Sequence, residues 1–409
     1  MPHLAMPLVG AVVPPGPTLR LHTGAAMPQI GFGSWGVRPR EVPLALRTAV
    51  ASGYRLFDLA PVYNNEAAVG DTLAALQAEG AVTRSDLFLT SKVAPADACD
   101  SERLRAAVRR TLHDLRTEYL DLYLVHWPFY VRPGAPSWPP PLDYQLGYSA
   151  AQLRETWCEM ERLVAEGRVR AIGLANIGPN RLAALLRAPD LRVRPAAVQV
   201  ELHPYNSQAS LRALCASNQI VVTAYASLGS AARPAKYQSA ADGHPTLLSD
   251  PAVLSVARAL GGTPAAVALG WALRRGVAVI PKSSRASRVR SNLEETLRLA
   301  PRMGPEALAS LDALERGHRY LAAGFQGYAW RRAMTMEQLW DDEPVPGFNR
   351  PFAWLVLGAV AACGCGALRL GTKCVRARRD ADRVARRLSF GVALEHISSP
   401  MSRRPMSSL

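Results

Sequence analysis

The chain has 409 residues, of which 49% are hydrophobic and 20% are charged. This balance excludes a globally disordered protein, and the length suits one large α/β domain with extensions. The formal net charge is +15, but residues 369–409 hold ten Lys and Arg against three acidic residues and so contribute +7 of it. The remaining body is mildly basic, as expected for an enzyme that binds an anionic ligand.

The first 17 residues are predicted to be an N-terminal extension. Their apolar run lacks a preceding basic segment and is broken by prolines, which disfavours a secretory signal. Residues 18–24 and 27–31 then predict a β-hairpin that turns at Thr23 and Gly24. The six cysteines show neither CxxC nor Cys/His spacing, so we expect no metal site and reduced thiols in a cytoplasmic protein.

Short apolar runs alternate with amphipathic stretches along the rest of the body. Residues 101–115, for example, place Leu, Ala and Val at helical spacing. Eight such strand-then-helix units predict an α/β fold, a closed parallel (β/α)8 TIM barrel that follows the hairpin. The predicted strands lie near residues 30–34, 55–58, 87–91, 120–126, 169–174, 197–200, 220–225 and 276–280.

Polar side chains close three successive predicted strands. Asp58 ends one strand and Tyr63 follows it, Lys92 closes the next, and His126 closes the third. Since the loops after the strands carry the chemistry of a TIM barrel, these groups are expected on one face. A nearby ammonium lowers the pKa of a phenol, and a carboxylate keeps that ammonium charged. The four residues together predict a proton-donating site, although each alone is more often a turn former or a packed core residue.

These residues belong to a wider pattern that resembles the aldo-keto reductase superfamily over roughly residues 18–345. The resemblance implies a monomeric enzyme that reduces aldehydes or ketones to alcohols by hydride transfer from NADPH. The matching segments are Gly53-Tyr54-Arg55 with Asp58, Ala60, Glu66 and Gly70, then Lys92 after Phe88-Leu89-Thr90-Ser91, His126-Trp127-Pro128, residues 169–173, residues 199–205, and Ile280-Pro281-Lys282-Ser283.

The resemblance assigns a role to each residue of the predicted site. It implies Tyr63 as the general acid, Lys92 as the partner that lowers its pKa, Asp58 as the counter-ion of Lys92, and His126 as the residue that orients the carbonyl. It further implies an apolar pocket for a small carbonyl substrate, lined by Trp35 and Trp127.

The cofactor phosphate is expected late in the chain. Lys282, Ser283 and Arg288 lie where the eighth predicted strand ends and a helix opens, the usual location of a phosphate in a TIM barrel. Judged by composition alone, these residues are better explained as the solvent-exposed basic start of a helix. The resemblance implies that these residues grip the 2′-phosphate of NADPH, so that NADPH is preferred to NADH, and that Asn292 meets the adenine. Ser291 replaces a Glu that is frequent in the family, which predicts looser adenine binding.

The nicotinamide end is also implied by the resemblance. Asn176 and Gln199 match the residues that contact the carboxamide, and Tyr225 matches the residue that stacks on the ring. Ala175 stands where the family usually has Ser, and a departure after Tyr225 changes the loop expected to cover the pyrophosphate. Both changes predict weaker cofactor binding with the chemistry retained.

Other interpretations compete with the reductase. Residues 31–36 match GxGxxG, which is typical of a Rossmann fold, but eight strand–helix units favour a barrel. A nucleic-acid binder would interleave aromatic residues among the Arg residues of the tail, which has only Phe390. A barrel that binds NADPH and serves as a regulatory or scaffolding subunit remains the alternative function.

The C-terminal segment is predicted to be separate from the barrel, which is expected to span residues 18–350. Within residues 351–409, the stretch 352–368 is nearly uncharged and is followed at once by basic residues. It is short for a membrane span. A membrane anchor helped by the basic residues, an extension without fixed structure, and a helix packed on the barrel are the interpretations that stay open.

Overall fold

Eight parallel strands form the centre of the fold in the computed structural model, which describes residues 16–135, 140–230 and 246–321. They are ordered β12-β11-β10-β9-β6-β5-β4-β3, so neighbours in the sheet are consecutive in the chain apart from one short hairpin. The strands are β3 (Gly31–Gly33), β4 (Leu56–Asp58), β5 (Phe88–Val93), β6 (Leu122–Val125), β9 (Ile172–Ala175), β10 (Ala197–Glu201), β11 (Val221–Tyr225) and β12 (Ala278–Val279).

Hydrogen bonds between the first and last strands bring the sheet nearly to closure. Ile30 and Val279 form a parallel bridge, and the backbone N–H of Gly33 donates to the carbonyl of Pro281 at 3.1 Å. A Cβ on Gly33 would lie 2.7 Å from the carbonyl oxygen of Ile280, so glycine permits this close approach. The predicted TIM barrel is confirmed, and each of its eight strands overlaps a predicted one.

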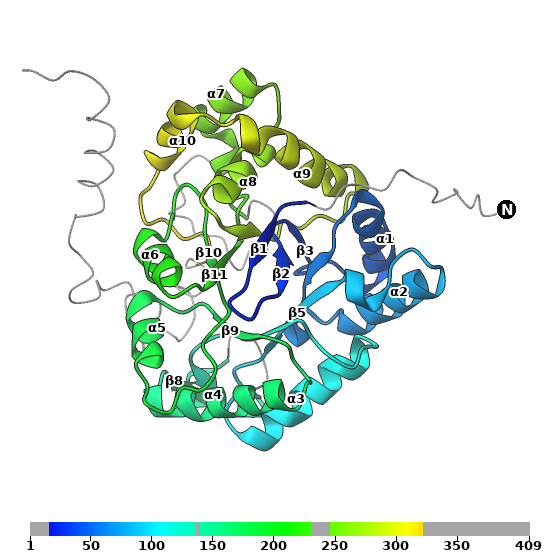
Figure 1. Cartoon of the computed structure of the whole chain (residues 1–409), viewed down its shortest axis with the longest axis vertical. Coiled ribbons are helices and arrows are strands. Elements are labelled where there is room, and N and C mark those ends of the chain that lie inside the picture. The colour runs from blue at the N-terminus through cyan, green and yellow to red at the C-terminus, as the bar shows by residue number, and fades with distance from the viewer. Residues whose placement is uncertain (1–15, 136–139, 231–245, 322–409) are drawn as a thin grey trace, which may run out of the picture. The chain divides into compact units, whose positions relative to one another are not determined.

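Helices surround the strands on all sides (Figure 1). Most of them follow a strand, and each buries apolar side chains, as α3 does with Leu104, Val108 and Leu112 at helical spacing. This helix begins after an N-cap in which Asp100 accepts from the N–H of Arg103. The helices are α1 (Val42–Ser52), α2 (Glu66–Ala78), α3 (Ser101–Asp114), α4 (Ala150–Ala165), α5 (Pro179–Leu186), α6 (Ala209–Ser217), α7 (Pro251–Leu260), α8 (Pro264–Arg274), α9 (Ala286–Leu299) and α10 (Pro305–Asp312).

The predicted N-terminal hairpin is present and lies across the middle of the ring of helices (Figure 1). It pairs β1 (Thr18–Arg20) with β2 (Ala26–Pro28) in antiparallel register. Leu21 and Met27 are each 1% exposed and pack in one cluster with residues that point into the barrel, such as Leu56 and Phe88. The hairpin therefore fills the end of the barrel at which the strands begin, which leaves the opposite end for chemistry.

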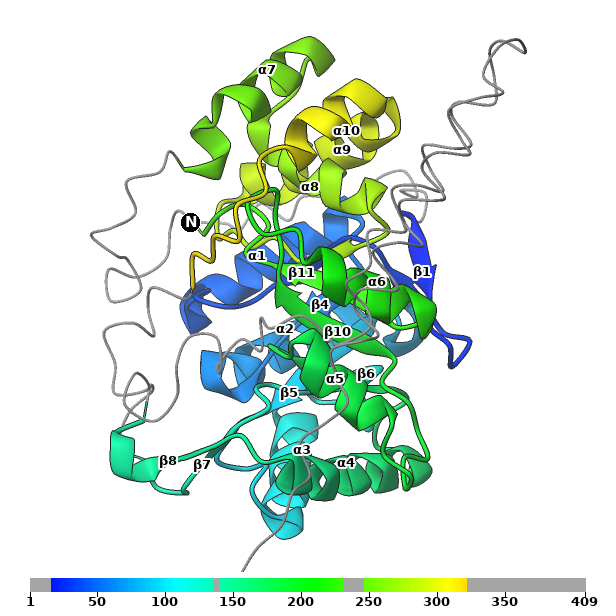
Figure 2. The same ribbon diagram turned by 90° about the vertical axis from the view of Figure 1, so that its left-hand side faces the viewer.

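A second hairpin interrupts the strand order after β6. It consists of β7 (Tyr130–Val131) and β8 (Gln145–Gly147), and Figure 2 shows it on the side of the barrel opposite β1. The predicted C-terminal tail at 351–409 and most of the predicted N-terminal extension lie outside the described residues, so the domain boundaries stay predictions. Among the described helices, no single one has the length and apolar composition to cross a membrane, whereas α7 and α8, bent by 91° at their junction, pass that test only as a pair.

Gly70 gives a direct test of the packing between α2 and α3. A Cβ at this position would lie 2.0 Å from the carbonyl oxygen of Asp114, a backbone atom that cannot move without shifting α3. We expect Gly70→Ala to lower the free energy of unfolding by about 3 kcal/mol despite the better helix propensity of Ala. Urea denaturation checks this. Gly16→Ala, whose Cβ would meet only Leu297 at 3.9 Å, serves as the control, and equal losses in the two variants would contradict the prediction.

Candidate active site

Three neighbouring strands deliver the predicted proton-donating residues to one end of the barrel. Asp58 is the last residue of β4, Lys92 lies in β5 beside it, and His126 directly follows β6. Tyr63 ends a short 3-10 helix, η2 (Pro61–Tyr63), in the loop after β4. The parallel register of these strands therefore brings together residues that lie far apart in the sequence.

The ammonium group of Lys92 is the centre of this cluster. Its Nζ donates to both carboxylate oxygens of Asp58 at 2.9 and 2.8 Å, to the carbonyl of Leu59 at 2.9 Å, and to the hydroxyl of Tyr63 at 3.1 Å. Lys92 is 0% exposed and Asp58 is 3% exposed. A buried ion pair of this kind is tolerated only when each charge has several hydrogen-bond partners, a condition that both groups meet.

Burial dominates the ionisation of the two central groups. It raises the pKa of the Tyr63 phenol well above its usual value of 10.0, and the charges of Asp58 and Glu66 raise it further. Burial also lowers the pKa of Lys92, against the opposing effect of the Asp58 carboxylate. Desolvation of the phenolate is thus the largest effect on the pKa of Tyr63, and the expectation that the Lys92 ammonium lowers this pKa stays a prediction. The phenol is protonated at neutral pH.

His126 presents a neutral imidazole beside the phenol. Its ring lies edge-on to that of Tyr63, with 5.9 Å between the ring centroids. Burial, and then the charge of Lys92, hold its pKa well below 6.5. Its Nδ1 is buried and has no hydrogen-bond partner among the described residues. A neutral imidazole can donate from one ring nitrogen only, so the tautomer decides which nitrogen is available to a ligand.

A second group of residues lies on the next strands around the barrel. Asn176, which follows β9, donates to the carbonyl of His126 at 2.8 Å and accepts from the Tyr225 hydroxyl at 2.5 Å. Gln199 in β10 donates to Asp58 at 2.6 Å. The predicted nicotinamide residues therefore form one hydrogen-bonded system with the predicted proton-donating residues. The link between Gln199 and Asp58 had no signal in the sequence, because the two positions are 141 residues apart.

The predicted phosphate residues gather at the start of α9. Lys282 is half-buried, which lowers its pKa, and its ammonium lies 3.7 Å from where a Cβ on Gly36 would stand. It makes no ion pair with any described residue, and Arg288 is exposed one turn into the helix. The N-cap residue Arg285 provides no side-chain cap, which leaves amides of the first turn available to an anion. Two cations and the free amides of this helix start fit a phosphate group.

The remaining predicted cofactor residues are nearby in the fold. Ser283 is 9% exposed, and its hydroxyl accepts from the backbone N–H of Arg285 at 3.0 Å. Asn292 is 6% exposed in α9, and Ser291 precedes it on the exposed side. Ala175 is the last residue of β9 and is 1% exposed. The predicted effects of Ser291 and Ala175 on cofactor binding stay predictions.

Aromatic side chains flank the cluster. Trp35 is 36% exposed in the loop after β3, and Trp127 is 7% exposed, with its ring centroid 5.1 Å from that of Phe129. Phe129 leads directly into the β7–β8 hairpin, so this hairpin belongs to the end of the barrel that carries Tyr63 and His126. Part of the loop after β11, which is expected to cover the pyrophosphate, lies outside the described residues.

Two polar residues near Tyr63 were not among the predicted site residues, although one of them, Glu66, belongs to the segment that resembles the family. Asn65 is 2% exposed and donates to the carbonyls of Ser34 and Val37 at 2.9 Å each, which fixes the Trp35 loop to the Tyr63 loop. Glu66 opens α2 and is 4% exposed. A signal for both was present in the sequence, because the polar run Asn64-Asn65-Glu66 joins the loop phenol to the helix that follows.

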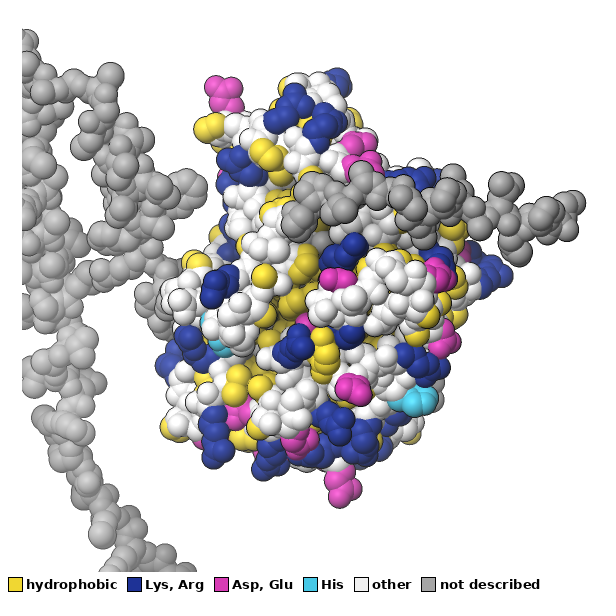
Figure 3. Space-filling model, turned by 45° about the vertical axis from the view of Figure 1, so that its right-hand side comes forward, with side chains coloured by type: hydrophobic (Ala, Val, Ile, Leu, Met, Phe, Trp, Pro, Cys, Tyr) yellow, Lys and Arg dark blue, Asp and Glu magenta, His cyan; other side chains and the backbone are white. Residues whose placement is uncertain are grey.

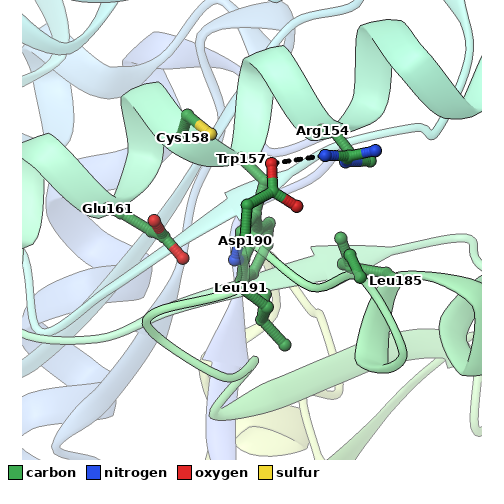
Figure 4. Close-up of a pocket in the computed structure, with 8 residues that line it drawn as sticks. Arg154, Trp157, Cys158, Glu161, Leu185, Asp190 and Leu191 are labelled. Carbon is green, nitrogen blue, oxygen red and sulfur yellow. Dashed lines mark hydrogen bonds and ion pairs between the residues drawn. The ribbon is translucent and has the colours of Figure 1, made fainter.

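The outer surface offers no comparable cluster among the described residues. Figure 4 shows a small cavity between α4 and α5 in which Arg154 is ion-paired with Asp190 at 2.5 Å beside Cys158 and Glu161. None of the predicted site residues lines it. On the face seen in Figure 3, Lys and Arg side chains are interspersed with Asp and Glu over the described body.

The fold and the site together define a class of protein. A TIM barrel that combines a buried phenol–ammonium–carboxylate cluster with a cationic helix start at the end of its last strand is the architecture of a nicotinamide-dependent oxidoreductase.

Comparisons with known proteins agree with this class. A family model described as the aldo/keto reductase family matches residues 26–308. Aldo-keto reductase family 1 member A1 of Rattus norvegicus is 40% identical over 302 residues, which are 74% of this chain and 90% of the relative. The Homo sapiens protein of the same name is 39% identical over the same shares. Aldo/keto reductase slr0942 of Synechocystis is 37% identical over 326 residues, 79% of this chain and 95% of the relative.

The chain belongs to the aldo/keto reductase family, as its sequence pattern indicated. It is an NADP-dependent oxidoreductase, and membership of the family supports the reduction of carbonyl groups in general.

The buried carboxyl of Glu66 predicts a pH dependence of stability. Burial raises the pKa of this group from 4.5 to about 7. The folded state therefore binds the proton more tightly than the unfolded state, and stability falls as the pH rises from about 4.5 to about 7 and then stays level. We expect Glu66→Gln to remove this loss, which is on the order of 3 kcal/mol.

Urea denaturation at pH 5 and pH 8 measures this effect. The free energy of unfolding of Glu66→Gln relative to the parent should rise between the two pH values, while exposed Glu102→Gln should leave the difference unchanged. An unchanged difference for Glu66→Gln would contradict the prediction.

Proposed function

We propose that the chain reduces an aldehyde or ketone to an alcohol with NADPH, and that Tyr63 delivers the proton. The observation that carries this proposal is the contact between Lys92 Nζ and the Tyr63 hydroxyl at 3.1 Å, in a cluster anchored by Asp58. A protonated phenol next to a buried ammonium is suited to donate to a developing alkoxide, because the ammonium stabilises the phenolate that remains.

The chemistry requires a hydride at the carbonyl carbon and a proton at the carbonyl oxygen. NADPH supplies the hydride when bound. The Tyr63 hydroxyl donates its proton to the carbonyl oxygen as the C=O π bond breaks, and the phenolate later recovers a proton from solvent. The neutral imidazole of His126, edge-on to the Tyr63 ring, orients the same oxygen by a hydrogen bond. Trp35 and Trp127 exclude water and favour an apolar carbonyl substrate.

The residues at the start of α9 account for a preference for NADPH. Lys282 and Arg288 bind the 2′-phosphate together with Ser283, and Asn292 contacts the adenine. Asn176 and Gln199 hold the carboxamide, and Tyr225 stacks on the nicotinamide ring. Support comes from Lys282, which forms no ion pair with a described residue because the nearby Glu41 is paired with Arg38, and from the hydrogen bond between Tyr225 and Asn176. The monomeric state, the cytoplasmic location and membrane contact of residues 352–368 stay predictions.

A regulatory or scaffolding subunit that binds NADPH without turnover is the second candidate. No described feature favours it over catalysis, since the proposed proton donor and its partners are all present and in contact. A lack of turnover across a broad panel of aldehydes would favour this alternative.

The proton donor is tested by Tyr63→Phe. The variant should lose at least roughly a hundredfold in kcat for an activated aromatic aldehyde, because it keeps the ring but has no proton to give. NADPH absorbance follows turnover, and quenching of protein fluorescence checks that NADPH still binds. Tyr119→Phe, in the segment that precedes β6 at the opposite end of the barrel, is the matched control and should keep its activity. Turnover by Tyr63→Phe at the parent rate would refute the assignment.

The phosphate site is tested by Lys282→Met. Removal of a cation that contacts the 2′-phosphate should weaken NADPH binding roughly tenfold or more and leave NADH binding almost unchanged. Titration calorimetry with both cofactors gives the ratio. Arg290→Met, which removes an exposed cation from the same helix, should change neither affinity by more than about twofold. Equal losses for NADPH and NADH in Lys282→Met would argue against a 2′-phosphate contact.

A further inference from the structure

Glu66 is a buried carboxyl directly outside the barrel wall that carries Lys92. It is the first residue of α2, three positions after Tyr63. Its Oε1 accepts from the hydroxyl of Ser91 at 2.6 Å, and its Oε2 accepts from the hydroxyl of Thr111 at 3.1 Å. Ser91 immediately precedes Lys92 in β5, and successive side chains of a strand point to opposite faces. Glu66 therefore holds β5 from outside at the point where Asp58 holds it from inside.

No described residue forms an ion pair with Glu66, in contrast to Asp58, which is paired with Lys92. The ionisable groups that act on it come from each element packed around it. Lys92 of β5 favours its charge and Asp114 of α3 opposes it. In turn, the charge of Glu66 raises the pKa of Lys92, of Tyr63, and of the buried Tyr123 in β6.

We propose that Glu66 is a positioning residue of the proton-donating site, which fixes β5 through Ser91 and sets, by its own charge, the pH range in which Tyr63 donates a proton efficiently. The proposal rests on the proposed role of Tyr63. When Glu66 is neutral, the Tyr63 phenol is the stronger acid. When Glu66 is ionised, its negative charge opposes formation of the Tyr63 phenolate in the same buried region. Hydride and proton transfer to the carbonyl should therefore slow as Glu66 ionises.

Other groups of the site do not produce this change near neutrality. Burial holds the pKa of His126 well below 6.5 and that of Tyr63 well above 10.0, whereas that of Glu66 is about 7. The pKa of Lys92 is also lowered, but a pH dependence caused by Lys92 would persist in a variant that lacks only the carboxylate of Glu66. Glu66→Gln separates the two effects because Gln keeps an oxygen that accepts from Ser91.

The test is the pH dependence of hydride transfer in a single turnover, with saturating NADPH and an activated aromatic aldehyde. The parent rate should fall roughly three- to tenfold between about pH 6 and pH 8, and Glu66→Gln should show no such fall. Thr111→Val keeps the carboxyl but removes one hydrogen bond to its charged form, so the midpoint of the fall should move to higher pH. Circular dichroism confirms that each variant is folded.

The outcomes separate this inference from the proposed function. The role of Glu66 would be overturned if the rate of hydride transfer fell with pH in folded Glu66→Gln as it does in the parent, or if the parent rate did not change over this pH range. In either case a loss of turnover in Tyr63→Phe would still show that Tyr63 is the proton donor. If Glu66→Gln does not fold, an unmoved midpoint in Thr111→Val overturns the proposal in its place. Undiminished turnover by Tyr63→Phe would instead remove the proposed function itself.

Discussion

The buried ion pair between Lys92 and Asp58 is the constraint on which the site depends. A fully buried ammonium is stable only when an opposite charge is nearby and its N–H groups have hydrogen-bond acceptors. The Asp58 carboxylate, the Leu59 carbonyl and the Tyr63 hydroxyl meet both conditions for Lys92. Each of these partners is thereby held in place by the same cation. Loss of either charge would leave the other buried and unpaired, which destabilises the site far more than loss of a surface pair.

The barrel provides polar groups on both faces of one strand. Lys92 points inward to Asp58, while the adjacent Ser91 points outward to Glu66 between the strand and the helices. Two carboxyl groups in different surroundings thus act on one proton-donating phenol. Asp58 is paired with a cation, whereas Glu66 is held by hydroxyl groups alone and ionises near neutral pH. Two carboxyl groups whose surroundings give them different pKa values can take different roles in one site.

Side chains divide the barrel into a packed end and a reactive end, whereas non-glycine residues with positive φ occur at both, as Arg116 and Gln219 before β6 and β11 show. The hairpin residues Leu21 and Met27 close one end with apolar contacts. At the other end, non-glycine residues with positive φ follow the strands, namely Asn64 at 55°, Asn176 at 57° and Ala226 at 53°. Such conformations cost about 1 kcal/mol or more each and are tolerated where tertiary contacts fix them, as the bonds of Asn176 to His126 and Tyr225 do.

The sequence by itself determined the eight strands, the N-terminal hairpin and the family, because strand–helix alternation is a local signal and the motif residues stand at fixed spacings. It also selected Asp58, Tyr63, Lys92 and His126, since each lies near the end of a strand or in the loop that follows one. Only the tertiary structure decided the direction of the Tyr63 pKa, the bond between Gln199 and Asp58, and the contacts of Asn65 and Glu66. Desolvation and contacts between distant segments depend on how all the surrounding elements pack, and local sequence patterns carry no measure of that packing.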